Sequence, residues 1–154
     1  IPEAHARFNA IKRSYFYRIV FSKNPFLQDL SWQLFQQPDV NAINEAVKIL
    51  LEYEDFECFS KVHTEVKHFR CTIYFAYWEL KEEQLLFHIT ANRFLRGMVR
   101  SIVGTLLEVG MGHRPIDDLH HIIASRDRTQ AGKAAPAKGL FLSQIEYPTP
   151  IYLD

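Results

Sequence analysis

The chain has 154 residues, which is enough for one domain with a buried core. Hydrophobic residues make up 47% and charged residues 23%, as in ordinary soluble globular proteins, and no apolar run reaches the roughly 18 residues of a membrane-spanning helix. Basic residues (Lys plus Arg) and acidic residues (Asp plus Glu) both number 18, so the zero net charge excludes a polybasic, histone-like protein and leaves local basic patches as the route to nucleic acid.

The first third of the chain predicts one strand and one helix. Residues 13–21 (RSYFYRIVF) are aromatic and β-branched, which favours a strand. Residues 39–54 carry an apolar stripe at helical spacing, and Asp39 or Asn41 can cap that helix. The stripe consists of Ile43, Ala46, Val47, Leu50 and Leu51. Residues 55–70 show no clear period and are expected to form a loop.

The middle of the chain predicts a hairpin followed by a long helix. Residues 71–80 and 84–91 are strand-like, and the KEE sequence between them suits a tight turn although it lacks glycine. Residues 91–110 (ANRFLRGMVRSIVGTLLEVG) have the spacing of an amphipathic helix.

The last part adds a short helix, a loop and a strand. Residues 115–126 begin with proline and acidic residues, which is typical of a helix start, residues 127–139 are a small-residue loop, and residues 140–147 form a strand. The order β-α-β-β-α-(α)-β predicts an α+β, ferredoxin-like fold of one domain over residues 1–154. Its antiparallel sheet would have the helices packed on one face and the other face free for a ligand or another domain.

Three arginines fall on one side of the expected helix at 91–110. On a helical wheel Arg93, Arg96 and Arg100 lie with Gly97 and Gly104, opposite the apolar side. The apolar side consists of Leu95, Met98, Val99, Ile102, Leu106 and Val109. The spacing therefore predicts a row of arginines on one face of the helix, with glycines beside it where another group could approach the backbone.

The arginine row has two interpretations that the pattern leaves open. Most charge rows are solvated faces of surface helices. The row contains only arginine, however, and each glycine costs a helix roughly 1 kcal/mol relative to alanine. Arginine suits phosphate or a buried carboxylate because its planar fork donates two parallel hydrogen bonds.

Basic and aromatic residues alternate in three other segments, residues 5–8, 12–17 and 60–70. This combination suits phosphates and unstacked bases. The alternative for Tyr15 or Tyr17 is that a strand aromatic simply points into the core.

No self-contained catalytic motif is present, since the chain has no Walker loop, G-x-S-x-G sequence or zinc-ligand spacing. Cys58 and Cys71 are too few for a disulfide scaffold, so we expect a reducing, cytoplasmic setting.

Several stretches together resemble the tRNA pseudouridine synthase A family. They are HARFNAIKRSYFYRI, DFECFSK, ANRFLRGMVRSIVGTLLEVG, AGKAAPAKGLFL and LSQIEYP. They occur in the family's order and cover essentially the whole chain. The resemblance implies conversion of uridine to pseudouridine in the anticodon stem-loop of tRNA, no metal, no organic cofactor and a homodimer.

The resemblance is to the C-terminal half of that family. Its catalytic aspartate lies in an N-terminal motif, R-T-D-x-G-V-H, which this sequence lacks; residues 126–134 (RDRTQAGKA) have Gln130 where the aspartate would be and match a different loop. The chain also starts at Ile1. We therefore expect a fragment that is inactive without the N-terminal half of the enzyme.

Site residues follow from the resemblance. Arg100 matches the arginine that pairs with the catalytic aspartate and keeps it ionised. Tyr15 matches the tyrosine whose ring lies against the target base, and Leu142 matches an apolar residue near the same base. The uridine would leave its stack to enter this cleft.

Three further arginines are expected to bind the substrate. Arg7 is expected to meet RNA, while Arg93 and Arg96 serve phosphate contact or structure. The alternative function is a non-catalytic RNA-binding or dimerisation module of ferredoxin-like shape. An RRM is disfavoured because residues 84–91 lack its glycine and carry one ring.

Overall fold

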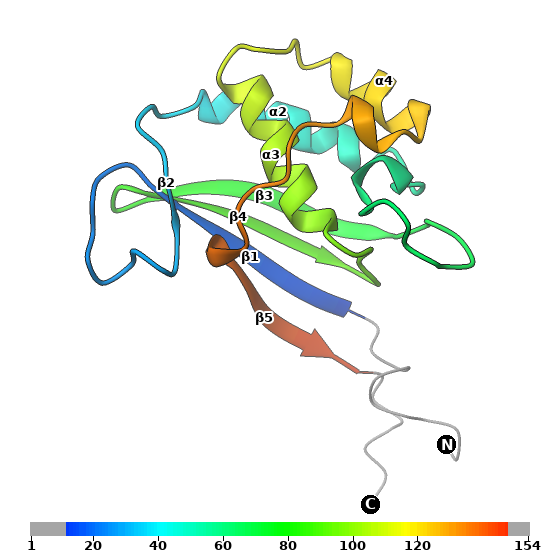
Figure 1. Ribbon diagram of the computed structural model, residues 1–154, viewed down its shortest axis with the longest axis horizontal. Coiled ribbons are helices and arrows are strands. Elements are labelled where there is room, and N and C mark those ends of the chain that lie inside the picture. Colours follow the sequence, from blue (N-terminus) through cyan, green and yellow to red (C-terminus); the bar gives the residue numbers. More distant parts are fainter. Residues whose placement is uncertain (1–11, 148–154) are drawn as a thin grey trace, which may run out of the picture.

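The computed structural model describes residues 12–147, in which helices cover one face of a five-stranded sheet (Figure 1). The strands are β1 (Lys12–Val20), β2 (Trp32–Gln33), β3 (Ile73–Lys81), β4 (Gln84–Ala91) and β5 (Leu140–Glu146). The α-helices are α2 (Val40–Leu50), α3 (Met98–Gly110) and α4 (Asp118–Ser125). Three short 3₁₀ turns are η1 (Glu57–Phe59), η2 (Arg128–Gln130) and η3 (Ala137–Gly139). The expected α+β class is confirmed.

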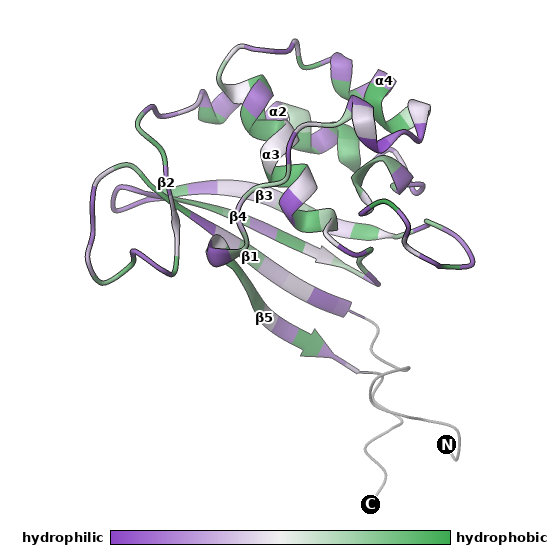
Figure 2. Ribbon diagram, viewed as in Figure 1, coloured by the Kyte–Doolittle hydropathy of each residue, from purple (hydrophilic) through white to green (hydrophobic). Residues whose placement is uncertain are grey.

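Strand β1 is the centre of the sheet, because it pairs antiparallel with both β4 and β5. Strand β3 pairs antiparallel with β4, and the two residues of β2 add a short parallel pair beside the end of β1. The side chains of β1 alternate as strand geometry requires: Tyr17 and Ile19 are buried under the helices, whereas Phe16 and Arg18 lie on the opposite face. Hydrophobic and hydrophilic bands also follow one another along β4 (Figure 2).

The first helix agrees with its sequence pattern. Asp39 caps α2 by accepting a hydrogen bond from the Ala42 backbone amide at 3.1 Å. Ile43, Val47 and Leu50 of the apolar stripe are buried against the rest of the core. The helix ends at Leu50, four residues before the expected end at residue 54, and Leu51 is exposed.

The start of α3 corrects the predicted helix at 91–110. Ala91 still belongs to β4, where it pairs with both Arg13 and Ile73, and Gly97 is the N-cap with a left-handed φ of 74°. Arg93 and Arg96 therefore precede the helix, so the predicted row of three arginines on one helical face is wrong.

Gly104 of α3 is buried rather than facing solvent, because the chain's own segment 131–136 lies against it. A Cβ built at Gly104 would meet the Lys133 carbonyl oxygen at 1.8 Å. The predicted close approach to the helix backbone is thus made by this segment.

Among the helices of residues 12–147, none has both the length and the apolar character that a membrane span requires.

Candidate functional site

Arg100 lies in the first turn of α3 and is held by the segment that covers that helix. Its Nε donates to the Ala135 carbonyl oxygen at 2.7 Å, and the Ala135 amide donates to the Arg100 carbonyl oxygen at 2.9 Å. The side chain is half-buried. This reciprocal pair of hydrogen bonds fixes the guanidinium group relative to the helix.

The fixed guanidinium has no anionic partner among residues 12–147. No carboxylate lies within 4.0 Å of it in the described residues, and the terminal nitrogens make no hydrogen bond there. A half-buried cation is poorly solvated, so an unpaired one favours binding of an anion. The two terminal nitrogens of the guanidinium group can donate two parallel hydrogen bonds to a carboxylate.

Tyr17 ties the same covering segment to the sheet. Its hydroxyl donates to the Pro136 carbonyl oxygen at 2.5 Å, and its ring touches Gly139, where a Cβ would lie 2.6 Å from the ring. Burial raises the pKa of Tyr17, an effect that the charge of Arg100 opposes. Tyr17 therefore remains a neutral donor that fixes the carbonyl next to the one held by Arg100.

Tyr15 and Leu142 face each other across the β1–β5 pairing, beside a β-bulge at Ser14/Tyr15. Tyr15 has the same orientation as Tyr17 two residues on, so both point to the helix-covered side. The Tyr15 ring meets Phe94 edge-on with centroids 5.0 Å apart, and half of the Leu142 surface is exposed. Tyr15 and Leu142 thus form an accessible apolar patch at the edge of the sheet.

A cavity of about 250 Å³ opens beside Tyr15. Arg13 and Arg96 line it together with the start of α3, and neither has a carboxylate within 4.0 Å among the described residues. The cavity therefore combines an aromatic wall with two cations, which suits a nucleotide.

The structure brings together some of the expected residues and separates others. Tyr15 and Leu142 lie in register. Arg100 is not among the residues that line the cavity beside Tyr15; its Nε bonds to Ala135, next to the Pro136 carbonyl that accepts from Tyr17 of the same strand as Tyr15. Arg96 lines the cavity beside Tyr15. Arg7 lies outside the described residues.

Arg93 is hydrogen-bonded to the loop that precedes β3. Its Nη1 donates to the carbonyl oxygens of His68 and Arg70, both at 3.0 Å, and lies 3.1 Å from His68 Nδ1. These bonds fasten the loop before β3 to the end of β4. Desolvation, together with the charges of Arg70 and Arg93, lowers the pKa of His68, which favours its neutral form beside the guanidinium.

Sequence reasoning did not assign Tyr17, Arg13 or Phe94 to the site. Tyr17 and Arg13 could have been found, because they share the face of Tyr15 by the two-residue period of a strand. The position of Phe94 depends on where α3 begins, and the apolar spacing of the sequence did not indicate that start.

Metal and thiol chemistry find no support in the described residues. Within residues 12–147 no three His, Cys, Asp or Glu side chains gather in a metal-binding group. Cys58 and Cys71 are buried and unpaired, and burial raises the pKa of the first to about 12 and of the second to about 11. Both remain neutral thiols, which are poor nucleophiles.

Comparison with known proteins gives consistent matches. The sequence pattern of a family described as tRNA pseudouridine synthase matches residues 46–148. A Parabacteroides distasonis protein named tRNA pseudouridine synthase A is 46% identical over 152 residues, covering 99% of this chain and 60% of that protein. Proteins of the same name are 46% identical in Porphyromonas gingivalis and 40% identical in Anoxybacillus flavithermus, covering 98% and 93% of this chain and 61% and 58% of the relatives. The chain thus spans about 60% of the length of these relatives.

Proposed function

Because the chain belongs to the tRNA pseudouridine synthase family, we propose that it forms the C-terminal part of the catalytic cleft of such an enzyme. The whole enzyme converts uridine to pseudouridine in the anticodon stem-loop of tRNA. Its catalytic aspartate comes from an N-terminal half, which supplies the R-T-D-x-G-V-H motif that this sequence lacks.

Arg100 is the partner of that aspartate. The observation that carries this assignment is a half-buried guanidinium whose Nε is fixed on Ala135 while its terminal nitrogens have no acceptor among the described residues. A cation at this position lowers the pKa of an incoming carboxyl group and keeps it ionised as a nucleophile. The bidentate geometry also fixes the direction of the carboxylate.

Tyr15 and Leu142 hold the base of the target nucleotide. The uridine leaves its stack and enters the cleft, where the aspartate attacks the nucleotide. The bond from uracil N1 to the ribose breaks, the uracil rotates, and C5 bonds to the same ribose carbon; the bond that the aspartate formed with the nucleotide breaks, which releases the carboxylate. C5 then loses its proton and N1 gains one, so substrate and product are isomers. The apolar patch keeps the detached uracil in place and excludes water.

The remaining arginines divide between substrate and structure. Arg96, which lines the cavity beside Tyr15, contacts a phosphate of the RNA, and Arg7 contacts RNA as well. The three hydrogen-bonding distances of Arg93 support a structural role for that residue instead.

The sheet of this chain bears on both the fold and the assembly of the enzyme. The strand order β5-β1-β4-β3 supports a ferredoxin-like arrangement of a single domain over residues 1–154, with β2 as an addition. Its uncovered sheet face supports a homodimer. The enzyme acts in the cytoplasm, where tRNA is modified, and needs neither metal nor organic cofactor.

Reconstitution tests the proposed function. Alone, the 154-residue chain should release no tritium from tRNA labelled at uridine C5, and addition of the N-terminal half of a close relative should restore turnover. Turnover by the chain alone would contradict the assignment of the nucleophile to missing polypeptide. A reconstituted pair that binds tRNA but never turns over would favour the alternative, a non-catalytic RNA-binding or dimerisation module.

Binding selectivity separates the two functions further. A tRNA that binds more tightly than an unrelated stem-loop of equal length supports the enzyme. Equal binding of both RNAs favours the general RNA-binding module.

A further inference from the structure

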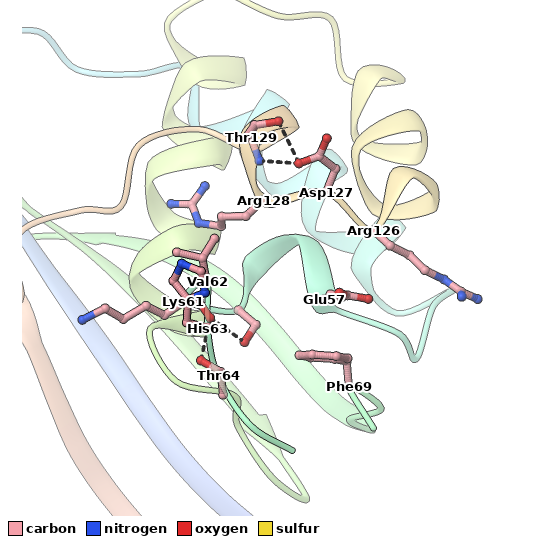
Figure 3. A pocket seen from close by; sticks show the side chains of 11 residues that line it. Glu57, Lys61, Val62, His63, Thr64, Phe69, Arg126, Asp127, Arg128 and Thr129 are labelled. Atoms are coloured by element: carbon pink, nitrogen blue, oxygen red, sulfur yellow. Dashed lines mark hydrogen bonds between the residues drawn. The ribbon is translucent and has the colours of Figure 1, made fainter. Parts of the chain in front are cut away.

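A second cavity, of about 380 Å³, lies between two loops that the proposed catalytic cleft does not use (Figure 3). One wall is η1 and the residues that follow it, up to Thr64. The other wall is the connection from α4 to η2, residues 126–129.

The charged side chains of this cavity are divided between its two ends. Lys61 and Arg128 extend toward the side of strand β1, whereas Arg126 extends the opposite way (Figure 3). Arg126 Nε lies 3.5 Å from an Asp55 carboxylate oxygen and is therefore compensated. Neither Lys61 nor Arg128 has a carboxylate within 4.0 Å among residues 12–147.

Two acidic residues, Glu57 and Asp127, also line the cavity and could offset its positive charge. The Asp127 carboxylate accepts hydrogen bonds from the Thr129 amide at 2.9 Å and the Thr129 hydroxyl at 2.7 Å, and these bonds lower the pKa of Asp127. Glu57 points to the same side as Arg126, away from the heads of Lys61 and Arg128 (Figure 3). The end with Lys61 and Arg128 is therefore the positive end.

Hydrogen bonds hold the backbone of Lys61 and the side chain of Arg128. The Lys61 amide donates to the Arg96 carbonyl oxygen at 2.8 Å, and the Thr64 hydroxyl donates to the Lys61 carbonyl oxygen at 2.5 Å. The left-handed φ of 63° at His63 turns this loop back on itself. Arg128 Nη1 donates to the Gly132 carbonyl oxygen at 2.9 Å, which leaves its other nitrogens free for a ligand.

The positive end is continuous with the candidate site. Lys61 is bonded to Arg96, and its Cβ lies 3.7 Å from a Cβ built at Gly97. Arg96 and Gly97 line the cavity that contains Tyr15. A strand of RNA whose nucleotide occupies the Tyr15 cavity would therefore pass along the loop that carries Lys61.

We propose that Lys61 and Arg128 bind a phosphate of the RNA backbone next to the nucleotide held at Tyr15. The inference rests on the proposed function, because that function supplies the RNA. A lysine gives a mobile point charge and an arginine a planar fork, and a phosphodiester with two free oxygens can accept from both. The pair positions the strand and takes no part in the chemical step.

Salt-dependent binding of a tRNA transcript to the 154-residue chain tests the pair. Each lost phosphate contact should reduce the slope of log affinity against log salt by about 0.7 to 0.9. Lys61→Gln is expected to weaken binding about fivefold at about 0.1 M salt, with that reduction in slope. Arg128→Gln should do the same, while Arg128→Lys should keep the slope because it keeps the charge.

Two control variants and one control ligand make the result specific. Lys81→Gln, at the far hairpin, and Arg126→Gln, at the other end of the cavity, should leave the slope unchanged. Polyglutamate should bind Lys61→Gln and the original chain equally. An effect on polyglutamate binding but not on tRNA binding would mean that the site takes carboxylates, and would overturn the proposal.

The outcomes separate this inference from the function on which it rests. Unchanged affinity and slope for Lys61→Gln, with tRNA still bound, overturn the phosphate site alone. Failure of the original chain to bind tRNA overturns the site and counts against the proposed function as well. Lys61 is exposed and its side chain makes no hydrogen bond among the described residues, so Lys61→Gln should fold even if Arg128→Gln does not.

Discussion

At the scale of single residues, Arg100 combines a fixed orientation with two terminal nitrogens that have no acceptor among the described residues. One nitrogen is committed to Ala135, which sets the orientation of the group, and the other two remain free. The entropy cost of orienting a long side chain is thus met during folding rather than at substrate binding. A pre-oriented arginine with free donors is what we expect of a residue that binds the nucleophile's carboxylate, and is not what we expect of a solvated surface charge.

Arg100→Lys tests that assignment in the enzyme reconstituted with its N-terminal half. Lysine keeps the charge but loses the fork and the bond to Ala135, so we expect turnover to fall by about 30-fold or more, equivalent to about 2 kcal/mol. The acidic limb of the pH–rate profile should move to higher pH, because a less well paired aspartate has a higher pKa. Both quantities can be read from tritium release across a pH series.

A merely structural arginine would behave differently. It would lower the urea midpoint of the chain together with turnover, and would leave the pH–rate profile in place. That pattern would contradict the proposed pairing.

Tyr17→Phe tests how strongly the covering segment is fixed. The change removes the bond from the Tyr17 hydroxyl to the Pro136 carbonyl oxygen and leaves that acceptor unpaired. We expect the free energy of unfolding to drop by about 1 to 2 kcal/mol in urea denaturation. Tyr15→Phe is the matched control: its hydroxyl has no hydrogen bond among the described residues, so stability should change by less than about 0.5 kcal/mol.

At the scale of elements, the sequence predicted those units that carry a clear period. Strands β1, β3 and β4, helix α2 and the final strand all lie within a few residues of their expected positions. The start of α3 could not be predicted, because Phe94 and Leu95 continue the apolar spacing and Gly97 reads as an ordinary helix glycine. Only its φ of 74° shows that the helix begins there. The two residues of β2 are too few to form a pattern.

The candidate site was predicted in part for similar reasons. Arg100, Tyr15 and Leu142 were assigned through the family resemblance, and the register of β1 with β5 does bring Tyr15 opposite Leu142. The Ala135 carbonyl that holds Arg100 lies 35 residues away in sequence. A backbone acceptor can belong to any residue type, so no sequence pattern indicates it.

The β3–β4 hairpin carries a local conflict that a substitution can relieve. Glu82 and Glu83 have left-handed φ values of 51° and 64°, as this type of two-residue turn requires. Glycine and asparagine adopt such φ values more readily than glutamate does. We expect Glu83→Gly to raise the free energy of unfolding by about 0.5 to 1 kcal/mol in a thermal melt. Lys81→Gly, placed in the extended strand next to the turn, should lower it instead.

At the scale of the whole molecule, the sheet has one covered and one uncovered face (Figure 1). The uncovered face carries stacked rings: Phe16 on Phe141 with centroids 5.1 Å apart, and Tyr77 on His88 at 4.6 Å. Phe75 extends this row and is 48% exposed. A contiguous aromatic surface of this kind is unfavourable in water and typical of an interface.

Self-association should therefore run through the uncovered face. Light scattering on the concentrated chain is expected to show species heavier than 18.1 kDa. Tyr77→Lys places a charge in the middle of the aromatic row and should shift the chain toward monomer, since a buried unpaired lysine is costly. Leu80→Lys is a matched control, because Leu80 lies on the same strand, is 48% exposed against 45% for Tyr77, and points to the other face. Equal effects of both variants would mean that the chain associates non-specifically through exposed apolar side chains. A monomer at high concentration before any substitution would contradict a homodimer through this face.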